Sequence, residues 1–103
     1  MTSPQDKPLL IFFTTERSGP ARRMESLLAH LARKERGRLR MSRVEADESQ
    51  ELAEALGVTQ IPTLVLIKDR KAIARLEGRA SAPQIEKLVA PHLAPREREP
   101  AAA

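Results

Sequence analysis

A serine at the start of a predicted helix is the first residue of this chain that could carry chemistry. Ser18 opens the segment Ser18-Gly19-Pro20-Ala21, which follows a run of apolar residues. A serine hydroxyl acts as a nucleophile only beside a positioned base, usually a histidine. The two histidines, His30 and His92, fall on separate predicted helices outside any recognisable triad. We therefore interpret Ser18 as the N-cap of a helix, a position that serine favours.

Composition excludes several classes of protein. The 103 residues include no cysteine, so the chain cannot form a disulfide, exchange one with a substrate or hold zinc through sulfur. Histidine and carboxylate residues do not cluster at the spacings of metal ligands, and no glycine-rich phosphate loop is present. We expect neither a metal nor another cofactor. The longest apolar run, 9–13, is too short to cross a membrane or to form a signal peptide, so we expect a cytoplasmic protein without membrane attachment.

Three arginines surround the start of the same predicted helix. Arg17, Arg22 and Arg23 lie beside backbone N–H groups that a helix N-terminus leaves free, and such ends attract anions. One hypothesis is therefore that phosphate, nucleic acid or an acidic peptide binds here. The alternative is a solvated surface, because 18 basic and 14 acidic residues are interleaved and leave a net charge of only +4. The two aromatic residues provide no stacking platform for bases.

The apolar pattern indicates the elements that would hold these residues. Residues 8–14 form a continuous apolar run, which is typical of a strand buried on both faces. A helix is expected from Pro20 to about Gly37, because methionine and leucine recur at helical spacing. The pattern then predicts a strand at 39–44, a short helix at 49–56, a hairpin of strands at 64–67 and 72–76, and a last helix with Ser81 as N-cap and an end or kink at Pro91.

The resulting order, β-α-β-α-β-β-α, predicts an α/β domain with a mixed four-stranded sheet. We expect one domain at 8–94, since a chain of this length is large enough for one hydrophobic core and too small for two. Residues 1–7 are polar and are expected to form an N-terminal segment outside the core. Residues 95–103 are charged and contain proline, so we expect a disordered tail.

Four groups of residues at the joints of these elements match one family. They are Ser18-Gly19-Pro20-Ala21 after a buried strand, the stretch Val44–Asp47, Gly57-Val58 followed by Ile61-Pro62-Thr63, and Gly78 after the hairpin. With them the chain resembles thioredoxin from about residue 9 to residue 93, without that family's first strand and helix. The resemblance implies a trimmed thioredoxin-like fold in which Pro62 is the family's cis-proline, opposite the active-site turn.

The resemblance also identifies which redox groups are missing. Thioredoxins carry Cys-Gly-Pro-Cys where this chain has Ser18-Gly19-Pro20-Ala21, and their reaction needs a thiolate that attacks a disulfide. Phe12 stands where thioredoxins bury an aspartate that serves proton transfer, and Thr14 and Arg17 stand where two tryptophans flank the dithiol. Ser26 replaces a proline that kinks the active-site helix. We therefore expect a redox-inactive member of the family whose turn serves as a helix cap.

A binding function could survive the loss of the dithiol. In thioredoxins an extended substrate segment pairs with the backbone of the residue before the cis-proline, a form of β-augmentation. That residue would be Ile61, with Arg17, Gly78 and Arg79 around the rim of a groove beside Pro62. The resemblance thus implies a non-catalytic module that binds another protein or a peptide segment. The opposing hypothesis is that Ile61-Pro62-Thr63 persists only because the fold requires it.

Two further hypotheses come from the same resemblance. The run Phe13-Thr14-Thr15-Glu16-Arg17-Ser18 is similar to thioredoxin-fold holdase co-chaperones whose first active-site cysteine is also a serine. Those proteins keep the second cysteine and carry tetratricopeptide repeats, and this chain has neither. An oxidoreductase that acts with an external thiol such as glutathione is the enzymatic alternative, and it would need a sulfur that the chain does not supply.

Overall fold

The computed structural model describes residues 7–95, so the predicted N-terminal segment and C-terminal tail lie almost entirely outside the described residues. The elements follow one another in the predicted order, which is confirmed. They are β1 (Leu9–Thr14), α1 (Gly19–Lys34), β2 (Arg40–Glu45), α2 (Gln50–Ala55), β3 (Thr63–Lys68), β4 (Lys71–Glu77), α3 (Ala82–Val89) and the short 3₁₀ helix η2 (Ala90–His92).

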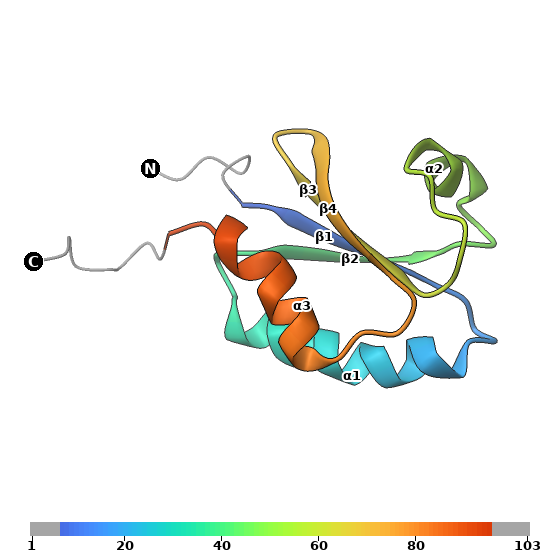
Figure 1. The fold of residues 1–103 in the computed structure, drawn as a ribbon, viewed down its shortest axis with the longest axis horizontal. Helices are drawn as coiled ribbons and strands as arrows, with labels where there is room; N and C mark the ends of the chain where they lie inside the picture. Colours follow the sequence, from blue (N-terminus) through green and yellow to red (C-terminus); the bar gives the residue numbers. More distant parts are fainter. Residues whose placement is uncertain (1–6, 96–103) are drawn as a thin grey trace, which may run out of the picture.

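The four strands form one mixed sheet in the order β2-β1-β3-β4. β1 pairs in parallel with β2 and antiparallel with β3, and β3 pairs antiparallel with β4. α1 and α3 lie together against one face of the sheet, and α2 lies apart from them near the opposite side (Figure 1). The predicted α/β fold with a mixed four-stranded sheet is therefore confirmed, and β2 and β4 are its two edges.

The apolar run of β1 is buried from both sides. Leu10 and Phe12 belong to the larger core, which includes the buried side chains of α1 and α3, and Ile11 and Phe13 belong to a smaller core with Ala53 of α2. Because side chains alternate between the two faces of a strand, a strand covered on both faces is apolar at every position. This explains why the sequence of β1 lacks the polar alternation of a surface strand.

Different contacts fix the backbone after α1 and after α2. α1 ends at Lys34, short of the predicted end at Gly37. Gly37 has a φ of +88°, in the left-handed region that glycine adopts without a steric penalty, so the chain turns there toward β2. After α2, the Arg75 guanidinium of β4 donates hydrogen bonds to the carbonyl oxygens of Leu56 and Gly57, which ties the end of this short helix to the sheet.

Candidate functional site

Ser18 is the N-cap of α1. Its Oγ accepts a hydrogen bond from the backbone N–H of Ala21 at 3.1 Å, and its carbonyl oxygen accepts one from the N–H of Arg22 at 3.2 Å. Pro20 occupies the first turn, where its missing N–H costs nothing. The hydroxyl oxygen therefore caps the N-terminus of α1, which is the role expected of serine at this position.

The histidines lie away from Ser18. His30 is exposed on α1, twelve positions further along, which is about 18 Å along the helix axis at 1.5 Å per residue. His92 lies in η2, beyond α3. Neither imidazole is a base for the Ser18 hydroxyl, so the arrangement does not support nucleophilic catalysis.

The second part of the candidate site is the loop that precedes β3. The Ile61–Pro62 peptide bond is cis. The Thr63 hydroxyl donates to the carbonyl oxygen of Gln60 at 2.8 Å, and the N–H of Gly78 donates to the carbonyl oxygen of Pro62 at 2.8 Å. The carbonyl oxygens of Gln60 and Pro62, the residues on either side of Ile61, thus both accept hydrogen bonds. Among residues 7–95, the N–H and C=O of Ile61 itself have no hydrogen-bond partner.

The sheet brings these segments together at one edge. Phe13 near the end of β1 pairs with Thr63 at the start of β3, and Thr63 pairs with Glu77 at the end of β4. The Ser18 turn after β1, the Ile61-Pro62 loop before β3 and Gly78 after β4 therefore leave the sheet at the same end. Gly78 has a φ of +84°, in the left-handed region that favours glycine, and a Cβ at this position would lie 3.8 Å from the Gln60 side-chain oxygen.

The arginines predicted around this turn lie among carboxylates. Arg17 is exposed and lines a surface hollow of about 200 Å³ together with four acidic side chains. These are Glu16, Glu45, Asp47 and Glu48. The Arg22 guanidinium donates to the carbonyl oxygen of Glu16 at 3.5 Å, and Arg23 is exposed. The surroundings of Arg17 therefore offset its positive charge.

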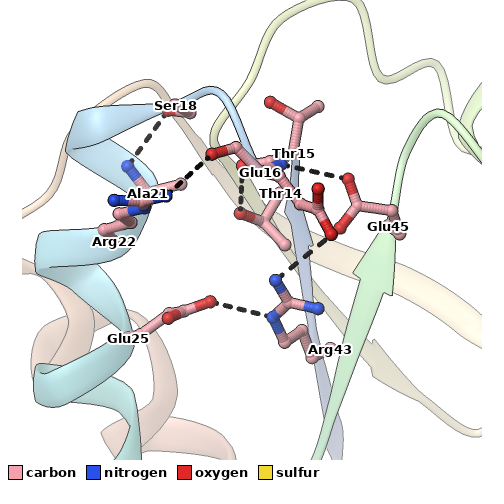
Figure 2. A network of polar contacts seen from close by, with 9 residues as sticks. All are labelled: Thr14, Thr15, Glu16, Ser18, Ala21, Arg22, Glu25, Arg43 and Glu45. Carbon is pink, nitrogen blue, oxygen red and sulfur yellow. Dashed lines mark hydrogen bonds and ion pairs between the residues drawn. The ribbon is translucent and has the colours of Figure 1, made fainter.

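A polar network that sequence reasoning missed joins this end of β2 to α1 (Figure 2). The Arg43 guanidinium bridges two carboxylates, with Nε 2.8 Å from Glu25 Oε1 and Nη2 3.6 Å from Glu45 Oε2. Glu45 Oε1 also accepts the N–H of Glu16 at 3.2 Å, so this carboxylate fixes the Ser18 turn against β2. The hydrogen bond to Glu25 raises the pKa of Arg43. No pattern in the sequence indicated this network, because its members lie on separate elements.

The positions where the redox groups were expected to be missing differ in burial and polarity. Phe12 is 3% exposed and packs in the larger core. It also lines a hollow of about 400 Å³ between α1 and β2, beside Leu28 and Met41. Thr14 is buried, whereas Arg17 is exposed. Among residues 7–95, no group of three histidine or acidic residues could hold a metal, and no helix is long and apolar enough to cross a membrane.

Comparison with known proteins decides the family. The family model described as Thioredoxin matches residues 2–91, most of the chain. The chain belongs to the thioredoxin family. A thioredoxin of Pseudomonas aeruginosa is 34% identical over 80 residues, which cover 78% of this chain and 74% of that protein. A thioredoxin of Alicyclobacillus acidocaldarius is 31% identical over 81 residues, covering 79% and 77% respectively.

Solved thioredoxin structures superpose on this fold. A thioredoxin of Nicotiana alata has a TM-score of 0.80 at 26% identity and covers 85% of this chain and 75% of its own. A thioredoxin of Fasciola hepatica has a TM-score of 0.79 at 26% identity, covering 84% and 82%. Since the chain contains no cysteine, this family member cannot perform thiol–disulfide exchange with sulfur atoms of its own.

Proposed function

We propose that this thioredoxin-family protein is a non-catalytic module that binds an extended segment of another protein beside Ile61. The supporting observation is that the N–H and C=O of Ile61 have no partner within residues 7–95, while the carbonyl groups of Gln60 and Pro62 are both bound. An extended segment can pair with a free donor and acceptor of one residue as an added strand does. This pairing needs no sulfur.

The surroundings of Ile61 define what kind of segment fits. The Ile61 side chain is half-buried and packs on the smaller core, so it offers a limited apolar surface. Arg17, which follows β1, and Arg79, which follows β4, are exposed near the end of the sheet where Ile61 lies, and Glu16 lies next to Arg17. We therefore expect a segment with one apolar residue against Ile61 and charged residues of both signs around it.

The structure gives the other functions less support. A holdase needs a broad apolar surface, and the large apolar side chains exposed within residues 7–95, Leu52 and Ile73, lie on α2 and β4 rather than at Ile61. The thioredoxin relatives support an oxidoreductase only weakly, because the chain lacks the sulfur atoms of the reaction. Binding of anions at Arg17, Arg22 and Arg23 is disfavoured by the carboxylates beside Arg17.

Selection from a library of displayed peptides provides a ligand for the test. The selected peptide is then N-methylated at one residue at a time, which removes a backbone donor and leaves the side chain. We expect one or two positions to lose about tenfold in affinity, the effect of one hydrogen bond of about 1.4 kcal/mol. Equal tolerance of N-methylation at every position would contradict backbone pairing.

A pair of protein variants locates the pairing. Ile61→Pro removes the amide donor of this residue, whereas the matched control Ile61→Val keeps the backbone and nearly all of the apolar side chain. We expect the first to lose peptide binding and the second to keep it, with circular dichroism showing that both fold. Equal binding by the two variants would place the site elsewhere. The cytoplasmic location that we expect is tested separately by cell fractionation.

A further inference from the structure

One end of the sheet gathers basic side chains from three separate parts of the chain. Leu9 of β1 pairs with Arg40 of β2 on one side and with Ile67 of β3 on the other. Lys68 and Lys71 face one another where the β3–β4 hairpin closes. Figure 1 shows the start of β1, the α1–β2 connection and the hairpin turn on the left, opposite to α2 and the start of α1. We name this surface the basic end, and it consists of Lys7, Arg36, Arg40, Lys68, Arg70 and Lys71.

Hydrogen bonds fix the backbone of the basic end. The N–H of Arg40 donates to the carbonyl oxygen of Pro8 at 2.9 Å, which joins the start of β2 to the start of β1. The neighbouring Arg38 is used internally, since its Nε donates to the carbonyl oxygen of Ala94 at 2.8 Å and its Nη1 contacts Glu35 at 3.1 Å. The loop that carries Arg36 is therefore held between α1 and the residues after α3. Hydrogen bonds therefore hold the backbone that carries Arg36 and Arg40 in place.

In the part of the chain that the structure describes, few carboxylates oppose these charges. Asp69 lies within the hairpin turn, and Glu35 is buried and paired with Arg38. Within residues 7–95, none of the six basic-end side chains takes part in a salt bridge. The opposite end of the sheet differs, because acidic residues there surround Arg17. Within residues 7–95 the charges are thus distributed unevenly, and the basic end carries an excess of positive charge.

We propose that the basic end binds the phosphate backbone of a nucleic-acid duplex without reading its sequence. Arg40 of β2 and Lys71 of β4 lie on the two edge strands, whose backbones are three strand spacings or about 14 Å apart, and the register places their side chains on opposite faces of the sheet. Long basic side chains that leave this end of the sheet on both faces can reach phosphates of both strands of a duplex, whose major groove in DNA is roughly 12 Å wide. Arginine guanidinium groups also match phosphate oxygens in a bidentate way. The chain has no tryptophan or tyrosine to stack on bases, which favours backbone contacts alone.

A duplex fits this surface better than a membrane or an acidic peptide. Interfacial membrane binding uses apolar side chains beside the basic ones, and Ile73, the nearest such residue in sequence among those exposed within residues 7–95, is only 39% exposed. An acidic peptide would follow a groove, whereas these cations extend across the ends of all four strands. A rigid array of phosphates matches that arrangement. Membrane and peptide binding become outcomes of the test.

The assay measures fluorescence anisotropy of a labelled 20-base-pair DNA duplex, and of an RNA duplex of the same sequence, between 50 and 200 mM salt. If four to six phosphates are contacted, the slope of log K against log salt is about −4 to −5. Each contact then contributes about tenfold in affinity at 50 mM salt. Equal binding of unrelated DNA sequences is expected, because the backbone and not the bases is contacted. The RNA duplex is expected to bind less tightly, because its A-form major groove is narrower.

Two triple variants with the same net charge locate the surface. The first, Arg36→Glu/Arg40→Glu/Lys71→Glu, changes the basic end. The second, Arg17→Glu/Arg22→Glu/Arg23→Glu, changes the opposite end by an equal amount. We expect the first to weaken duplex binding at least about 100-fold at 50 mM salt and to lower the slope by about 3, and the second to change the slope by less than 1. Circular dichroism melting confirms that both variants fold.

Three results would overturn the proposal. The first is no duplex binding by the wild-type protein at 50 mM salt. The second is an equal loss in both triple variants, which would mean that net charge alone matters, or a loss only in the second variant. The third is that the basic-end variant loses binding to vesicles with 30% phosphatidylserine, or to a polyglutamate peptide, while duplex binding is unchanged. Retained binding of Ile61→Pro to duplexes would show that this surface works independently of the peptide site.

Discussion

The assignment of Ser18 as a helix cap makes a quantitative prediction for Ser18→Ala. Of the first amides of α1, that of Arg22 is bound by the Ser18 carbonyl and Pro20 has none, so the amide of Ala21 is the one that depends on the Ser18 side chain. Ala21 is 0% exposed, which keeps water from replacing the lost acceptor. The cost is therefore expected at the upper part of the usual range for caps, about 1–2 kcal/mol.

For a domain of this size, a loss of 1–2 kcal/mol lowers the melting temperature by about 5–15 °C. Far-ultraviolet circular dichroism during heating and in urea measures it, since the chain lacks tryptophan and tyrosine as fluorescent probes. Ser18→Asp keeps an acceptor and adds a negative charge at the helix N-terminus, so it is expected to restore the stability.

Ser26→Ala is the matched control, because it removes an exposed hydroxyl from the middle of the same helix. Alanine has the higher helix propensity, so this variant should be as stable as the wild type or slightly more stable. The cap assignment would be refuted by a Ser18→Ala protein that melts with the wild type, or by a Ser18→Asp protein that melts with Ser18→Ala.

Three other predictions follow from the same contacts. In the insulin reduction assay with dithiothreitol, the protein should give no acceleration over dithiothreitol alone, and any turnover would contradict the absence of redox chemistry. Phe12→Ala should lower the free energy of unfolding by about 3–5 kcal/mol in urea, since Phe12 is 3% exposed, and a loss below 1 kcal/mol would refute its place in the core. Arg75→Ala should speed hydrogen exchange of the α2 amides about fivefold, through loss of roughly 1 kcal/mol of local stability. Arg75→Lys should not rescue it, because one ammonium cannot bridge two carbonyls in the same way, and full protection in either variant would show that the sheet does not hold this helix.

Short sequence patterns were sufficient to predict the helices and strands and the serine N-caps. The unbroken apolar run of β1 reflects burial on both faces, and the serines at 18 and 81 each accept an N–H of the first helical turn. The Gln84 side chain completes the cap at Ser81, because it accepts the Ser81 N–H at 2.8 Å. These features depend on a few neighbouring residues, so the sequence alone carries them.

Contacts between distant residues could not be predicted in this way. Nothing near Arg75 in the sequence indicates that it reaches the end of α2, and nothing near Arg17 indicates the carboxylates that β2 brings beside it. The β3–β4 turn contains no glycine, yet Asp69 and Arg70 have φ angles of 53° and 67°. Strand pairing on either side imposes this conformation on residues that rarely adopt it.

The burial of Phe12 makes the loss of redox chemistry difficult to reverse in evolution. A cysteine at position 18 would lie at the half-buried N-cap of α1, and one at position 21 would be buried in the first turn of the helix. An aspartate at position 12 would replace an aromatic ring that lines the hollow between α1 and β2 beside Leu28 and Met41, and it would take a carboxylate out of water there. Arg43, which lines the same hollow, is already paired with Glu25 and Glu45. The aspartate substitution costs several kcal/mol, a large share of the 5–15 kcal/mol that holds a domain folded. A chain with aspartate at this position would therefore have to repack the core between α1 and β2 first.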